Sequence, residues 1–126
     1  MFPEWINKII RRRIRSIAGT LQNKTPDDLR VLADQIRKKV PGSAVLIFSI
    51  SAEAEKINFV LVLAETFRST NLNAKEMALE ISLLIDGSAG GRADFAQGGG
   101  RNKEGILKAI QKFKQQIAQH KDKPCK

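Results

Sequence analysis

Apolar and polar residues alternate along this chain in two patterns, which predict different elements. Apolar residues repeat at the spacing of a helix with one buried face in four segments, 2–14, 26–40, 74–85 and 103–117. Continuous apolar runs of strand length fill residues 43–50 and 57–64. Such runs are typical of strands covered on both faces. The chain is therefore predicted to combine several helices with a small, well-buried sheet.

The segment 26–40 carries the clearest helix signals. Thr25 is a suitable N-cap, Pro26 suits the first helical position, and two aspartates follow in the first turn, where the helix dipole favours negative charge. Three cations occupy the last turn, and Pro41 with the glycine after it ends the helix. The two apolar runs that follow are joined by a short polar connection, so we expect an antiparallel pair of strands.

Two further helices are predicted with their caps. Asn73, followed three residues later by Glu76, resembles a capping box and opens the helix up to residue 85. Asn102 caps the last helix, although Gly105 in its first turn does not suit a regular helix. Residues 14–21 stay ambiguous, because their apolar pattern fits either a continuation of the first helix or a strand.

Residues 87–100 are the most distinctive segment, because they hold six of the nine glycines. As a loop between two helices they would present backbone N–H groups to a phosphate, with Arg92 and Arg101 on either side as guanidinium donors. Alternatively, the glycines only allow close packing of a strand against helices, with Arg92 paired to Asp94 or to a helix C-terminus. The segment fits neither the Walker nor the dinucleotide-binding pattern, and both interpretations stay open.

Charge points to a polyanionic partner. The 126 residues carry 22 Lys and Arg against 13 Asp and Glu, a net charge of +9. Residues 1–40 and 101–126 are basic, whereas residues 41–100 are mildly acidic. If the two ends meet, they form one positive surface. Arg11, with the arginines that follow it, is the densest cluster, and a transit peptide or membrane anchor there is disfavoured because no cleavage-like site follows.

Several function classes are disfavoured by composition. A single cysteine, Cys125, cannot form an internal disulfide, and His120 is the only histidine, so zinc clusters and serine–histidine–aspartate triads are nearly excluded. The apolar runs are far shorter than the roughly 20 residues that span a bilayer. We therefore expect no catalytic residue, no metal site and no membrane contact.

The glycine-rich segment resembles a known family. Residues 87–99, GSAGGRADFAQGG, are similar to the signature of the DHHA1 domain near the C-terminus of alanyl-tRNA synthetases, a domain shared with DHH phosphoesterases. The matching positions are Gly90, Gly91, Arg92, Asp94, Ala96, Gln97, Gly98 and Gly99. The departures are Ser88, Ala89, Ala93 and Phe95. The resemblance covers roughly residues 15–118 and includes the LRVLAD stretch after Asp28. The Asp-x-Ala-Gln core favours the synthetase branch.

The resemblance implies one α/β domain, a small mixed sheet of about four strands with three to four helices packed on it. The implied DHHA1-like domain covers residues 15–120, with the end of a preceding helical segment over 1–14 and a flexible tail over 121–126. A strand over 15–21 would open the sheet, and residues 95–97 would add another. On this view the chain is part of a larger synthetase.

The resemblance also implies a function, that of the C-terminal C-Ala domain of alanyl-tRNA synthetases. Such a domain holds the elbow of alanine tRNA in the cytoplasm so that the aminoacylation and editing domains can act. It is no enzyme on its own and has no cofactor; ATP, magnesium and zinc belong to the other domains. Self-association, or contact with the rest of the synthetase, is also implied. The alternatives are the nucleic-acid-binding half of a DHH phosphoesterase and a dimerisation module.

The residues expected to contact nucleic acid come from the glycine-rich segment and from the two basic ends. They are Gly90, Gly91, Arg92, Asp94, Gln97, Gly98, Gly99, Arg101, Lys103, Lys108, Lys112, Arg11, Arg12 and Arg13. Among them, Arg92 is expected to contribute most, and Lys108 and Lys112 less.

Overall fold

The computed structural model describes residues 4, 16–40, 42–51, 56–64 and 72–122, the last five of these for their backbone only. Its elements are β1 (Ser16–Gln22), α2 (Pro26–Lys39), β2 (Ala44–Ser51), β3 (Lys56–Leu63), α4 (Ala74–Leu84), β4 (Ser88–Gly91), β5 (Phe95–Gly100), the 3-10 turn η1 (Lys103–Gly105) and α5 (Ile106–Asp122). Apart from Glu4, the segment 2–14 that was predicted as a helix, with Arg11, Arg12 and Arg13, lies outside the described residues, as does most of the tail.

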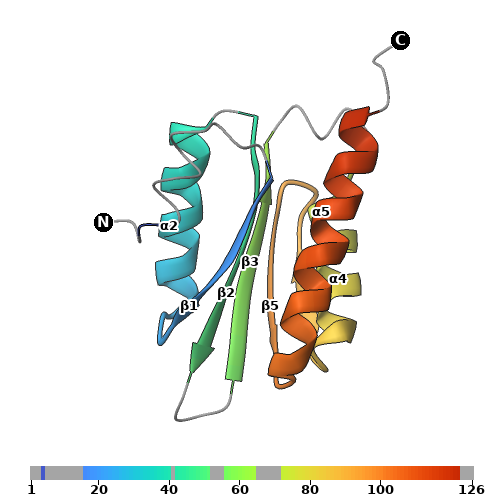
Figure 1. The fold of residues 1–126 in the computed structure, drawn as a ribbon. Coiled ribbons are helices and arrows are strands. Elements are labelled where there is room, and N and C mark those ends of the chain that lie inside the picture. Colours follow the sequence, from blue (N-terminus) through green and yellow to red (C-terminus); the bar gives the residue numbers. More distant parts are fainter. Residues whose placement is uncertain (1–3, 5–15, 41, 52–55, 65–71, 123–126) are drawn as a thin grey trace.

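The strands form one mixed sheet in the order β1-β2-β3-β5-β4. β1 runs parallel to β2, and the other neighbouring pairs are antiparallel. Helix α2 covers one face, and α4 and α5 lie together on the other (Figure 1). The predicted α/β class is confirmed, and residues 16–21 of the ambiguous region belong to a strand, β1, which ends at Gln22. The sheet has one strand more than expected.

The core lies on both sides of β2 and β3. Phe48 and Phe59, whose ring centroids are 5.5 Å apart, pack with Phe113 between the sheet and the α4–α5 layer. Ile47 and Val60 point to the other side and pack under α2. Each of these side chains is at most 1% exposed. The two continuous apolar runs are therefore strands covered on both faces, as predicted.

Local signals place the helix ends. The Thr25 hydroxyl accepts a hydrogen bond from the Asp28 N–H at 3.1 Å, and the Asp28 carboxylate accepts one from the Thr25 N–H at 3.2 Å, a complete capping box. The Asn73 side chain accepts from the Glu76 N–H at 3.2 Å. Asn102 instead caps η1, so the last helix begins with a 3-10 turn before it becomes α-helical at Ile106.

The glycine-rich segment differs most from expectation. Residues 87–100 do not form a loop with a single strand around 95–97. They form a β-hairpin, in which β4 is an edge strand and β5 pairs with both β4 and β3. This hairpin supplies the additional strand. Since side chains in a strand alternate between two faces, the motif residues divide between two sides of the sheet.

Candidate nucleic-acid interface

One side of the hairpin serves packing. Ala96 is fully buried toward α4, and its neighbours on that side include Gly98 and Gly100. A Cβ atom added at Gly100 would lie 2.3 Å from the carbonyl oxygen of Ile85, at the end of α4. Helix α4 can approach β5 this closely only because these positions lack side chains. For this side, the packing interpretation of the glycines is confirmed.

The opposite side of the hairpin is accessible. Gly90 pairs with Gln97, and Gly99 lies between Ser88 and Asn58 in the ladder, so these five residues share one side, which we call the open face. Among the described elements, α2 packs mainly on β2 and β3 on this side of the sheet (Figure 1) and contacts the hairpin at its turn end, where Arg30 lies over the Phe95 ring. Ser88 and Gln97 are exposed, and a Cβ added at Gly90 would meet nothing within 4 Å. Packing within the described chain therefore gives no reason for a glycine at position 90.

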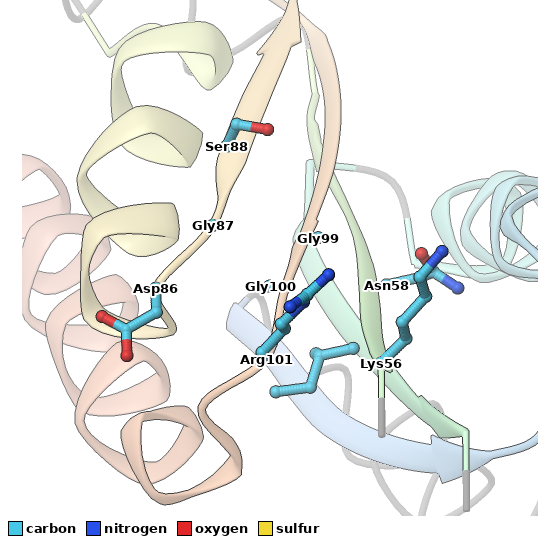
Figure 2. Close-up of a pocket in the computed structure, with 9 residues that line it drawn as sticks. Lys56, Asn58, Asp86, Gly87, Ser88, Gly99, Gly100 and Arg101 are labelled. Carbon is cyan, nitrogen blue, oxygen red and sulfur yellow. The ribbon is translucent and has the colours of Figure 1, made fainter. Parts of the chain in front are cut away.

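A pocket of about 300 Å³ lies at one end of the open face. Figure 2 shows Asp86 and Ser88 on one side of it, Lys56 and Asn58 on the other, and Arg101 between them. Ile57 and the backbone of three glycines complete the lining. Two cations, an amide, a hydroxyl and accessible backbone are the groups that proteins use to contact phosphates and sugars. With the carboxylate of Asp86, the lining has a net charge of +1.

The turn between β4 and β5 forms the other end. Arg92 Nε lies 3.9 Å from Asp94 Oδ1, and the Arg92 side chain is 79% exposed. Of the two partners considered for Arg92 in the packing interpretation, Asp94 is the one present, but such a long surface pair leaves the guanidinium available to a ligand. The N-terminus of α4 holds the turn in place, because the N–H groups of Ala74 and Lys75 donate to the carbonyls of Ala93 and Arg92, at 2.8 and 3.1 Å.

The residues that the sequence predicts to contact nucleic acid do not all lie on one surface. Gly90, Gln97 and Gly99 lie on the open face. Arg92 and Asp94 lie in the hairpin turn, and Arg101 and Lys103 follow the other end of β5. The backbone positions of Gly91 and Gly98 lie in β4 and β5, where an added Cβ would meet Ala96 and Ala89.

Lys108 and Lys112 lie on α5, which packs on the opposite face of the sheet from α2 (Figure 1). The described basic residues of the two terminal thirds therefore occupy both faces, and they do not merge into the single positive surface that charge alone suggested.

Sequence reasoning did not find Lys56 and Asn58. They reach the glycine-rich segment only because β3 pairs with β5, and no local motif marks them. Only the register between β3 and β5, which places Asn58 opposite Gly99, could have identified them.

The described part of the chain was also expected to hold neither a metal site nor a membrane span. No group of three histidine, cysteine or acidic side chains within it is arranged to hold a metal ion. None of its helices has both the length and the apolar character that a bilayer crossing requires.

Comparison with protein families gives a match to the DHHA1 domain over residues 13–119. Curated relatives include the alanine–tRNA ligase of Alkaliphilus oremlandii, 32% identical over 102 residues, which covers 81% of this chain and 11% of the relative. The alanine–tRNA ligase of Francisella tularensis subsp. novicida is 34% identical over 111 residues, covering 85% of this chain and 13% of the relative. The chain thus spans only a small part of these relatives.

Solved structures agree with this match. The C-Ala domain from Aquifex aeolicus alanyl-tRNA synthetase superposes with a TM-score of 0.70 at 35% identity, covering 79% of this chain and 87% of that domain. RecJ from Thermus thermophilus superposes with a TM-score of 0.63 at 13% identity, covering 91% of this chain and 17% of RecJ. At that identity, the likeness to RecJ shows a shared fold alone.

Proposed function

Because the chain belongs to the DHHA1 family, as a C-Ala domain of the alanyl-tRNA synthetase type, we propose that it binds tRNA. It holds the tRNA at the elbow, where the D and T loops meet, in the cytoplasm. The aminoacylation and editing domains of an alanyl-tRNA synthetase act on the same tRNA. The 126 residues match a C-Ala domain and do not include those catalytic domains. This domain therefore contributes binding and positioning, and needs no cofactor of its own.

The open face is the observation that carries this proposal. A folded RNA elbow is recognised mainly by shape, through phosphates, 2′-hydroxyls and exposed bases. Asn58 and Gln97 offer amide donors and acceptors, Ser88 offers a hydroxyl, and Gly90 leaves the backbone accessible to close approach. Cations lie at both ends, Arg101 with Lys56 at one and Arg92 at the other.

The two alternative functions have less support. The likeness to RecJ, at 13% identity, shows a shared fold alone and does not favour a DHH phosphoesterase. The match to the C-Ala domain has the higher identity, 35%, and the higher TM-score, 0.70, and it covers 87% of that domain against 17% of RecJ. A dimerisation module predicts an elution volume that depends on protein concentration and no affinity for tRNA. Gel filtration across a range of concentrations, alongside tRNA titration, distinguishes a dimerisation module from a tRNA-binding domain.

Changing Arg92 to Ala is expected to weaken tRNA binding about tenfold while the fold stays intact. The side chain is exposed, and its pair with Asp94 at 3.9 Å contributes at most about 1 kcal/mol to stability. A charged hydrogen bond to phosphate contributes more than that to binding. Fluorescence anisotropy with labelled tRNA at two salt concentrations, with thermal unfolding as a fold control, measures both effects. Absence of tRNA binding by the wild-type chain, even at low salt, would refute the proposal.

The elbow assignment is tested by the choice of tRNA. The elbow is similar in different tRNAs, so alanine tRNA and an unrelated tRNA are expected to bind with affinities within about threefold, because phosphate and shape contacts carry little sequence information. A competition titration of the two against one labelled tRNA measures the ratio. A preference of about a hundredfold for alanine tRNA would mean that the domain contacts a part of the tRNA other than the elbow.

A further inference from the structure

A second pocket, of about 230 Å³, lies between α2 and the hairpin turn. Arg30 and Arg37 reach it from α2, Arg92 reaches it from the turn, and Phe95 lies among them. We call it the arginine pocket. Arg30, Asp34 and Arg37 are spaced four and three residues apart, so they share one side of the helix. Neither Arg30 nor Arg37 was expected from the sequence to contact nucleic acid.

Arg30 is held in place by an aromatic ring. Its Cζ atom lies 5.3 Å from the ring centroid of Phe95, which is itself half-buried beside the α2 core. A guanidinium on a ring face is attracted to it and keeps its N–H groups free for a ligand. No carboxylate in the described ranges forms an ion pair with Arg30. Phe95 therefore orients a cation, and its ring face is not free to stack on a base.

The charges of the pocket leave a positive excess. Arg37 pairs with Asp34 at 3.2 Å and Arg92 pairs with Asp94 at 3.9 Å, and all four of these side chains are at least 38% exposed. Exposed pairs of this kind are weak and readily exchange a carboxylate for another anion. Three guanidinium groups against two carboxylates give the pocket a net charge of +1. The unpaired charge is that of Arg30, which has no carboxylate partner among the described residues.

The size of the pocket indicates what it binds. Pockets that enclose a small molecule usually measure about 300–1,000 Å³, so 230 Å³ suits one group of a larger ligand. A phosphate fits the bidentate donors of arginine. The pocket with Lys56 and Arg101 lies at the far end of β5, and six residues of strand at about 3.3 Å each put roughly 20 Å between the two. That span is longer than a single nucleotide.

We propose that the arginine pocket binds a backbone phosphate of the same RNA that crosses the open face. Arg30 and Arg37 then fix one end of the RNA segment, and Lys56 and Arg101 fix the other. This inference rests on the proposed function, because it assigns a further contact within tRNA binding. It adds a part of α2 to an interface that the motif alone confines to the hairpin.

The test compares two double variants of the full chain that lose the same charge from the same helix. Arg30→Ala with Arg37→Ala removes the two pocket cations that α2 supplies and leaves Arg92. Lys38→Ala with Lys39→Ala removes two exposed cations that do not line the pocket. For the first pair, we expect tRNA affinity to fall about tenfold or more and the salt slope to fall by about two. For the second pair, we expect a loss of about threefold or less. Thermal unfolding checks that both variants fold.

The outcomes separate this inference from the proposed function. Equal losses in the two double variants, with tRNA binding by the wild-type chain intact, would overturn the arginine pocket alone. No binding by the wild-type chain would overturn both proposals. An acidic protein segment is the competing ligand. If the Arg30/Arg37 double variant keeps the tRNA affinity of the wild-type chain but loses binding of labelled polyglutamate, the pocket binds acidic peptide and the RNA assignment is wrong.

Discussion

Changing Gly105 to Ala is expected to destabilise the domain by about 3 kcal/mol, the typical upper range for forcing extra volume into a packed site. In a regular helix the same change stabilises by about 0.5–1 kcal/mol, because alanine has the higher helix propensity. Here Gly105 is buried, and an added Cβ would lie 1.9 Å from the carbonyl oxygen of Leu84. The obstacle is backbone at the end of α4, which cannot move aside as a side chain would.

That junction is also fixed by hydrogen bonds. The carbonyl oxygen of Ile85 accepts from the N–H groups of Arg101 and Asn102, at 2.9 and 3.0 Å. A shift of η1 away from α4 would therefore weaken these bonds as well. The glycine that did not suit a predicted helix is explained by the close approach of two elements distant in the sequence.

Urea unfolding monitored by circular dichroism measures the loss of stability caused by Gly105→Ala. Gly90→Ala is the matched control, because the same methyl group is added where it meets nothing within 4 Å. Its free energy of unfolding is expected to stay within about 0.5 kcal/mol of the wild type. A Gly105 variant as stable as the Gly90 variant would contradict the packing of η1 against α4.

The parts of the fold that could be predicted are those with local causes. The capping box of Thr25 and Asp28 fixes the start of α2, and the apolar runs give β2 and β3. The hairpin could not be predicted in this way. A strand is recognised by alternating side chains, and half of the residues in β4 and β5 are glycines, which have none.

The candidate site was predictable to the same extent. The motif residues Arg92 and Gln97 could be named because they lie within one continuous segment. Lys56, Asn58 and Arg30 could not, because strand pairing and the docking of α2 bring them to the hairpin from elsewhere in the chain. Composition indicated an anionic partner, but only the sheet topology separates the cations near the open face from those on α5.

Changing both Lys56 and Arg101 to Ala is expected to lower tRNA affinity about a hundredfold at moderate salt. Each cation lines the pocket at the end of the open face, beside Asn58 and Ser88 (Figure 2). A charged hydrogen bond contributes about 1.5–3 kcal/mol, and about 1.4 kcal/mol corresponds to a factor of ten in affinity. The slope of log affinity against log salt should fall by about two.

The matched control replaces Lys108 and Lys112 with Ala, which removes the same charge from α5 on the opposite face of the sheet. Long-range attraction is screened beyond about 8–10 Å at physiological salt. The control variant should therefore lose only severalfold in affinity, and less as salt is raised. Fluorescence anisotropy with labelled tRNA at two salt concentrations compares the pairs directly. If the α5 variant lost as much affinity as the open-face variant, the RNA would have to bind on the face of the sheet that α4 and α5 cover. The two cations on that side would then act at contact distance.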